Sequence, residues 1–267
     1  MMNRITRRDW AGLAAAGTLS HLLAGLVQPA QAQPDATAAS KPRIAMLVHP
    51  DMVMLDLIGP LTVFSLLRAE LHLVWKDRQP IVNELGLPLT PSTSYADCPA
   101  ELDILFVPGG LKGSVALMED AQTLAFLADR GARARYVTAV CTGSLVLGAA
   151  GLLKGYRATG HWYIRDLLAP MGATVEAKRV VIDRNRITGG GVTAGIDFGL
   201  TVAAELRGEE TARLTQLVLE YDPQPPFDAG SPERAGAKLT GDVLARRQPL
   251  IDAAKRSAES AKIRLSL

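Results

Sequence analysis

The feature that most constrains the fold of this chain is a buried strand that stops at a cysteine. Residues 135–144 read Arg-Tyr-Val-Thr-Ala-Val-Cys-Thr-Gly-Ser, so a short apolar run ends at Cys141 and small residues follow it. The next segment, 144–150, is apolar and compatible with a helix. A sharp strand-to-helix turn of this kind holds the nucleophile of α/β hydrolases, here with sulfur in place of a serine oxygen. The pattern predicts an α/β fold that presents Cys141 at the end of a strand.

The chemistry expected of that cysteine follows from the helix behind it. The first N–H groups of a helix and the positive end of its dipole point at such a sulfur and favour the thiolate, which is the nucleophilic form. We therefore interpret Cys141 as a nucleophile. A structural role is the alternative, because free cysteines are among the most buried residues. The second cysteine, Cys98, precedes Pro99 in an expected loop and is interpreted as structural.

Short apolar runs alternate with helix-compatible segments along the chain, which predicts a doubly wound, mostly parallel sheet with helices on both faces, as in flavodoxin-like α/β folds. We expect strands at 44–48, 71–75, 102–107, 136–140, 180–182 and 186–188, a hairpin-like excursion over 81–90, and helices at 59–67, 121–131, 194–206 and 209–220. Such sheets bind ligands at the carboxyl ends of their strands. Asp51, the turn Pro108-Gly109-Gly110 and Cys141 are therefore expected to meet in one crevice.

Length and composition allow this fold to form one domain. With 267 residues, 48% of them hydrophobic, the chain can bury a large core, and we expect residues 43–267 to form a single α/β domain. Its C-terminal tail, 242–267, is rich in Arg and Lys. We interpret the tail as a solvated helix at a subunit contact.

The first 32 residues differ from the rest. Thr6-Arg7-Arg8-Asp9-Trp10 precedes a mildly apolar stretch, and Ala30-Gln31-Ala32 is a typical cleavage site, so residues 1–32 are predicted to be a twin-arginine signal peptide. Residues 33–42 are predicted to be a flexible leader. The protein is then periplasmic, with no membrane contact after the signal is removed. The remaining chain has 26 basic and 26 acidic residues, which gives no indication of nucleic acid as a partner.

One carboxylate stands among aliphatic residues, in Met54-Leu55-Asp56-Leu57-Ile58-Gly59-Pro60. Asp56 has two interpretations. It caps the helix that follows, as aspartate often does, or it lies beside the thiol with a pKa raised by its apolar surroundings, so that it exchanges protons during catalysis.

Several motifs together resemble one family. They are Leu55-Asp56-Leu57-Ile58-Gly59-Pro60, Val107-Pro108-Gly109-Gly110, Val140-Cys141-Thr142-Gly143-Ser144, His161-Trp162, Thr188-Gly189-Gly190-Gly191-Val192-Thr193-Ala194-Gly195 and Leu219-Glu220-Tyr221-Asp222-Pro223. From about Arg43 to about Ser231 the chain resembles the PfpI-type superfamily, which includes the parkinsonism-associated deglycase and the class I glutamine amidotransferases. The isonitrile hydratase branch is the most similar.

The resemblance implies roles for single residues. Cys141 is the implied nucleophile, Asp56 the acid that handles protons, and Thr142 a source of a hydroxyl and a backbone N–H. Gly110 is the implied second backbone donor of an oxyanion-type pocket, with Gly109, His161, Gly190 and Val192 around it. The implied reaction adds water to an isonitrile, giving an N-substituted formamide through a thioimidate on Cys141. The resemblance also implies a homodimer.

Other activities are open at this point. Cys141 is also suited to a redox or ligand sensor without turnover, and another PfpI-type hydrolase is a further alternative. The hydrolase alternative is weakened by Thr142, because related peptidases and amidotransferases place a histidine directly after the cysteine or oriented toward it. A transcription regulator needs a C-terminal helix-turn-helix pair, for which residues 232–267 are too few. The four histidines, at 21, 49, 72 and 161, have no paired-ligand spacing, so neither a metal nor another cofactor is predicted.

Overall fold

A mostly parallel sheet runs through the part of the chain that the computed structural model describes, residues 41–267. Within these residues, seven strands pair in the order β5-β2-β1-β6-β7-β11-β10, and each pair is parallel except β11 with β10. The strands are β1 (Arg43–Leu47), β2 (Glu70–Trp75), β5 (Thr93–Ser94), β6 (Ile104–Val107), β7 (Tyr136–Val140), β10 (Val180–Asp183) and β11 (Arg186–Gly189). The predicted sheet is confirmed. The predicted signal peptide and most of the predicted leader lie outside the described residues.

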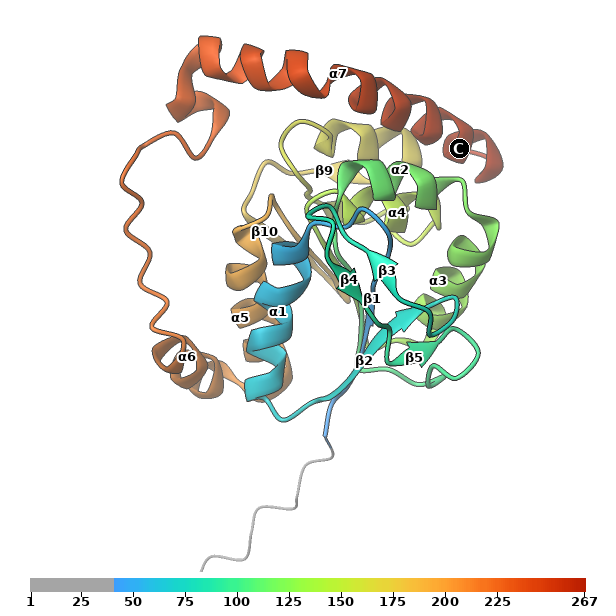
Figure 1. Cartoon of the computed structure of the whole chain (residues 1–267), viewed down its shortest axis with the longest axis vertical. Helices are drawn as coiled ribbons and strands as arrows, with labels where there is room; N and C mark the ends of the chain where they lie inside the picture. Colours follow the sequence, from blue (N-terminus) through green and yellow to red (C-terminus); the bar gives the residue numbers. More distant parts are fainter. Residues whose placement is uncertain (1–40) are drawn as a thin grey trace, which may run out of the picture. The chain divides into compact units, whose positions relative to one another are not determined.

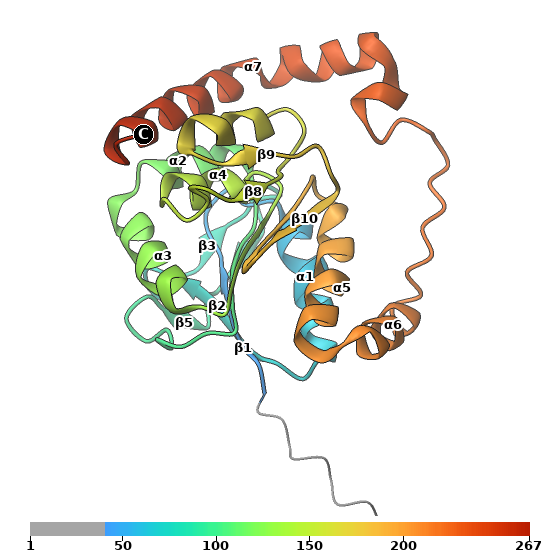
Figure 2. The same cartoon turned by 180° about the vertical axis from the view of Figure 1, so that it is seen from behind.

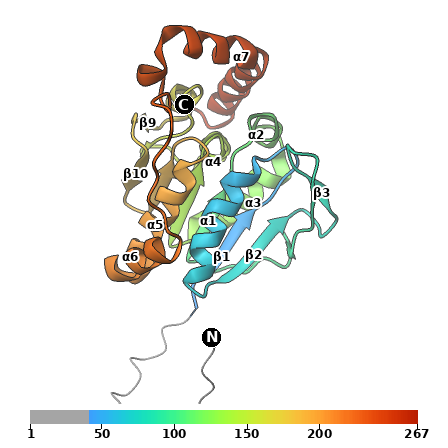
Figure 3. The same cartoon turned by 60° about the vertical axis from the view of Figure 1, so that its left-hand side comes forward.

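Helices cover both faces of this sheet because its strands are apolar on both sides. Along β1, Ala45 and Leu47 face one core cluster and Ile44 and Met46 face the other. Figures 1 and 3 show α1 and α5 on one side and α2, α3 and α4 on the other. The helices are α1 (Met54–Leu66), α2 (Leu111–Met118), α3 (Ala121–Arg133), α4 (Gly143–Ala149), α5 (Ala194–Arg207), α6 (Glu209–Val218) and α7 (Pro232–Arg264), with a short 3₁₀ helix, η1 (Arg165–Met171).

Helix α1 starts earlier than the sequence predicts. We expect it to open at Gly59-Pro60, but it begins at Met54 and contains Pro60. Proline lacks the N–H that an interior helical residue donates, so packing must compensate. Close contact with α5 does so: a side chain at Gly195 would begin 3.3 Å from the Pro60 ring. Asp56 therefore lies in the first turn of α1, where Val53 holds the cap position, and the capping interpretation of Asp56 is wrong.

The C-terminal tail is also longer and less solvated than predicted. Helix α7 is kinked at Gly236, where φ is 79°, and crosses the end of the sheet above α2 and α4 (Figures 1 and 2). Its second half buries Ala254, Ala258 and Ala261, which recur at helical spacing and let the backbone approach the body. Its first half remains exposed. No helix among residues 41–267 has both the length and the apolar character needed to span a bilayer.

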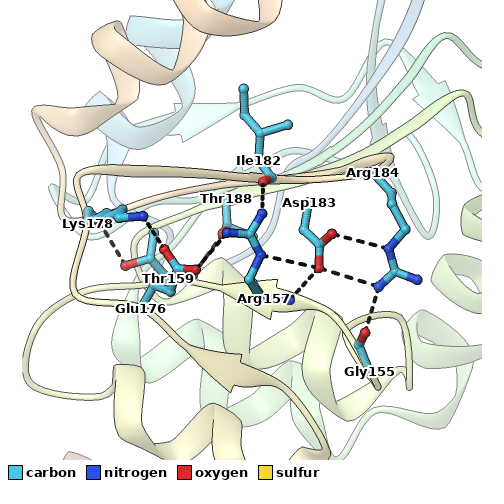
Figure 4. Close-up of polar contacts among 9 residues, drawn as sticks. All are labelled: Gly155, Arg157, Thr159, Glu176, Lys178, Ile182, Asp183, Arg184 and Thr188. Atoms are coloured by element: carbon cyan, nitrogen blue, oxygen red, sulfur yellow. Dashed lines mark hydrogen bonds and ion pairs between the residues drawn. The ribbon is translucent and has the colours of Figure 1, made fainter.

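Two small sheets complete the fold. Strands β3 (Ile81–Val82) and β4 (Pro88–Leu89) form the predicted hairpin, and strands β8 (Arg157–Ala158) and β9 (Thr174–Val175) lie beside β10. A polar network ties β8 to β10: the Arg157 N–H donates to Asp183, and its guanidinium reaches Glu176 at 2.9 Å (Figure 4). Thr159 N–H donates to Thr188 Oγ1 on β11. These bonds fix the loop that leads to His161.

Candidate active site

Cys141 lies at the sharp turn between β7 and α4, as predicted. Its φ is 56°, a conformation that non-glycine residues rarely adopt and that is found at strained functional turns. Its N–H donates to the carbonyls of Gly189 and Gly190, at 3.1 and 2.7 Å, so β11 holds the turn in place. Gly143 follows where a side chain would collide with the Val107 carbonyl. The thiol is presented at a rigid position, and the residue is 2% exposed.

The first turn of α1 places the Asp56 carboxyl beside this thiol. Oδ2 accepts a hydrogen bond from the Gly109 N–H at 2.9 Å. Oδ1 makes no hydrogen bond of standard geometry within residues 41–267, yet the Cys141 thiol lies close enough to act on the carboxyl. Burial raises the pKa of Asp56 to about 7, against the lowering effects of Cys141 and the Gly109 N–H. At neutral pH this carboxyl is therefore both an available acid and an available base.

The expectation of a resting thiolate is not met. Burial, and next the negative charge of Asp56, raise the pKa of the Cys141 thiol, although the N–H groups of Val192 and Thr142 lower it. Desolvation of a sulfur anion outweighs two N–H dipoles here because Cys141 is almost completely buried. Two adjacent buried anions repel each other strongly, so Asp56 and Cys141 together retain at least one proton at neutral pH.

The Pro-Gly-Gly turn and Thr142 hold the pair together. A side chain at Gly109 would begin 2.5 Å from Asp56 Oδ2 and 2.8 Å from Cys141 Cβ, so only glycine fits there. The Gly110 N–H donates to Thr142 Oγ1 at 2.8 Å, and that hydroxyl also contacts Ser114 Oγ at 2.8 Å. The N–H groups of Gly109 and Gly110 are thus used within the protein, and the donor role suggested for Gly110 stays a prediction.

The remaining predicted residues surround the sulfur. The His161 N–H donates to the Cys141 carbonyl at 3.2 Å, and its ring packs against that of Tyr163 with centroids 3.8 Å apart and planes tilted by 36°. Burial, and then the charge of Arg247, lower the pKa of His161 to about 4, so its imidazole is neutral at pH 7. Within residues 41–267 this ring makes no hydrogen bond with the thiol. His161 is therefore a pocket residue and not part of a Cys-His pair.

Cys98 takes no part in this site. It is buried in the core cluster on the other side of the sheet, where Arg130 contacts it. Both Cys98 and Cys141 are free thiols. Among residues 41–267 no group of three or more His, Cys, Asp or Glu side chains is arranged to hold a metal ion.

A pocket of about 530 Å³ opens above Cys141. Its floor is Cys141, and α7 forms much of its outer wall. The side chains that sequence reasoning missed come from Tyr163 and from α7, and they include Leu239, Val243, Arg246 and Arg247. No local motif indicates them, because α7 lies about a hundred residues from Cys141 in the chain. The segment that leads directly into α7, residues 219–231, has no helix or strand.

Known proteins are similar to this chain in both sequence and architecture. Over 226 residues the chain is 51% identical to a protein named isonitrile hydratase from Pseudomonas putida, covering 84% of this chain and 98% of that one. A crystal structure of a THiJ/PfpI family protein from Pseudomonas syringae superimposes with a TM-score of 0.81 at 47% identity, covering 86% of this chain and 98% of that one. Drosophila melanogaster DJ-1beta shares the fold, with a TM-score of 0.63 at 22% identity, over 67% of this chain and 98% of that one.

The family assignment rests on the region that carries the site. Residues 42–205 match the DJ-1/PfpI family, and this range includes Asp56, the Pro-Gly-Gly turn, Cys141 and His161. The mostly parallel sheet that carries these residues is the fold that the sequence resemblance implied. The chain belongs to the DJ-1/PfpI family.

Proposed function

We propose that this chain is an isonitrile hydratase-like enzyme that converts R–N≡C and water into R–NH–CHO through a thioimidate on Cys141. The observation that carries the proposal is the Asp56 carboxyl, with a pKa of about 7, in contact with a buried thiol at the floor of a pocket. The likeness to the Pseudomonas putida isonitrile hydratase supports the same substrate class.

The first step joins the thiol to the isonitrile. Asp56 takes the proton from Cys141 as the sulfur attacks the terminal carbon, and returns it to that carbon, which gives R–N=CH–S–Cys141. A carboxyl with a pKa near neutrality is suited to both transfers. The raised pKa of the thiol fits this order, because deprotonation then accompanies attack and no solvent-exposed thiolate is needed.

The second step releases the product. Asp56 accepts a proton from water as the water oxygen attacks the thioimidate carbon, and the nitrogen receives that proton. The C–S bond then breaks as the hydroxyl proton passes through Asp56 back to sulfur. The products are the formamide and the original thiol. No electron leaves or enters the system, so neither an oxidant nor a reductant takes part. Thr142 would hold the turn through Gly110 and Ser114, and its N–H would steady the leaving sulfur.

The alternative functions fit the geometry less well. A redox sensor needs an exposed thiol of low pKa, whereas Cys141 is buried and the pKa of its thiol is raised. A hydrolase with a Cys-His pair needs an imidazole that forms a hydrogen bond with the thiol, and the His161 ring does not form one within residues 41–267. A regulator needs a helix pair that reads DNA, but residues 232–264 form the single kinked helix α7.

The test is turnover of a simple alkyl isonitrile by the purified protein, with the formamide followed by mass spectrometry. We expect product from the parent protein and none from Cys141→Ser or Asp56→Asn. Thr138→Ser, a buried position on β7 away from the pocket lining, is the matched control and retains turnover. Rapid alkylation of Cys141 by the isonitrile with no formamide would favour the sensor and end this proposal.

Two further proposals concern assembly and location. Exposed apolar side chains at Leu214, Leu217 and Phe227 are compatible with a homodimer, which analytical ultracentrifugation would detect. Export to the periplasm depends on residues 1–32, and fractionation of cells with and without the substitution of Arg7 and Arg8 by lysine would test it.

A further inference from the structure

Two arginines in the pocket above Cys141 have no ion-pair partner among the described residues, 41–267. Arg246 and Arg247 both line this pocket, and within residues 41–267 neither makes a hydrogen bond or an ion pair. Among the lining residues the one acidic side chain is Asp242, and it already pairs with Lys238 at 2.8 Å. The pocket wall therefore carries positive charge that no ion pair within the described part of the chain neutralises.

The charge of Arg247 acts on the side chains that flank the thiol. It contributes to the lowered pKa of His161, whose N–H is bonded to the Cys141 carbonyl. Burial raises the pKa of Tyr163 to about 12, and the charge of Arg247 partly counteracts this increase. Arg247 and Cys141 line the same pocket, so an anionic group bound near Arg247 would lie in the same space as a substrate of Cys141.

The neighbouring pocket provides a comparison within the same protein. It has a volume of about 590 Å³ and adjoins the first one at Trp162 and at residues 230–232. Three of its four basic side chains make ion pairs: Lys178 with Glu176 at 2.7 Å, Arg179 with Asp197 at 2.6 Å, and Arg234 with Asp228 at 2.8 Å. The fourth, Arg165, interacts electrostatically with Glu233, which lines the same pocket. The pocket that holds the nucleophile differs, because within residues 41–267 neither of its two arginines makes an ion pair.

Apolar side chains line two sides of this pocket. Val53 and Leu111 line the side next to the sheet, and Leu239 and Val243 line the side formed by α7. A ligand that satisfies all of these surfaces has an apolar body and one anionic end. Arg is also the side chain best suited to hold a carboxylate, through two parallel N–H bonds.

We propose that the physiological substrates are isonitriles that carry a carboxylate on an apolar body, with the isonitrile carbon at Cys141 and the carboxylate at Arg247, assisted by Arg246. This inference rests on the proposed hydratase function and names its substrate class. Hydration leaves the carboxylate unchanged, so the products are N-formyl amino acids in the broad sense. The reaction that supplies the substrate must form an isonitrile on a carboxylic acid.

The experiment compares isocyanohexanoate with its methyl ester, which has the same body without the charge. The measured quantity is the ratio of kcat/KM for the acid to kcat/KM for the ester, in low-salt buffer without added carboxylate or phosphate. We expect the ratio to fall about tenfold to hundredfold in Arg247→Met, as loss of a charge-assisted hydrogen bond predicts, and by less in Arg246→Met. Arg256→Met, an exposed position on α7 that does not line the pocket, is the control and keeps the parent ratio.

A binding measurement separates failure of this inference from failure of the hydratase proposal. Calorimetry with Cys141→Ser, and with the same variant carrying Arg247→Met, measures the affinity for N-formylaminohexanoate and its methyl ester. Arg247-dependent binding of the acid without turnover of any isonitrile would end the hydratase proposal and keep the carboxylate site. Turnover with equal ratios in all variants would overturn the carboxylate site and leave the hydratase. Absence of any preference for the acid over the ester with Arg247 in place, in both readouts, would also overturn the carboxylate site.

Discussion

Replacing Asp56 by Asn should make this protein more stable at alkaline pH while it destroys activity. In the folded chain, burial raises the pKa of this carboxyl from 3.8, the value of a solvated group, to about 7. A folded-state pKa above the unfolded one contributes stability that is fully present below the unfolded pKa and is lost as the pH rises through the folded pKa. The parent protein should therefore lose stability between pH 4 and pH 7.

The magnitude follows from the two pKa values. Each tenfold change in proton affinity is worth about 1.4 kcal/mol, so complete ionisation of Asp56 lowers the free energy of unfolding by about 4 kcal/mol, of which about 2 to 3 kcal/mol falls between pH 5 and pH 8. Asparagine does not ionise and keeps an oxygen for the Gly109 N–H, which now bonds Oδ2. That part of the pH dependence should be missing from Asp56→Asn.

The assay is urea unfolding of both proteins at pH 5 and pH 8, followed by circular dichroism. The difference between the two proteins at each pH cancels the contributions of His49 and His161, which both retain. We expect the free energy of unfolding of Asp56→Asn minus that of the parent to increase by about 2 to 3 kcal/mol between pH 5 and pH 8. An equal pH slope for the two proteins would refute the reasoning, because Asp56 would then be ionised in the folded state at low pH, as a structural ion is.

Three further outcomes follow from packing. Gly109→Ala puts a methyl group between Asp56, Cys141 and the Thr142 N–H, so we expect formamide production to fall by at least about a hundredfold through misplacement of the pair, while far-ultraviolet circular dichroism stays unchanged. Phe106→Ala leaves a hole between Phe64 and Phe198 and should lower the free energy of unfolding by about 3 to 5 kcal/mol in urea titrations. Ala258→Glu buries a charge where α7 packs on the rest of the domain. Hydrogen exchange along 254–261 should therefore accelerate, and KM should rise because the pocket wall formed by α7 moves away from Cys141. Unchanged exchange would show that this half of α7 does not hold the pocket wall in place.

The sequence by itself determined the sheet and the position of the nucleophile. Local patterns were sufficient for β7, which runs from Tyr136 to Val140 as predicted, because a strand buried on both faces reads as an unbroken apolar run. The turn at Cys141 followed from small residues directly after that run. The motifs around Asp56 and Cys141 identified the two groups, and the parallel topology predicted that strand ends would bring distant segments together.

Tertiary structure decided what local patterns cannot express. Helix α1 contains Pro60 because glycines on α5 allow close packing that a single-helix preference opposes. The thiol is neutral at rest because its desolvation, which depends on all of the segments packed around it, exceeds the effect of the N–H groups of Val192 and Thr142. The pocket acquires Arg246 and Arg247 only because a stripe of alanines docks the far half of α7 on the body. The stability of α1, the pKa of the thiol and the position of α7 all depend on contacts between segments that are distant in the chain. Sequence periodicity does not indicate such contacts.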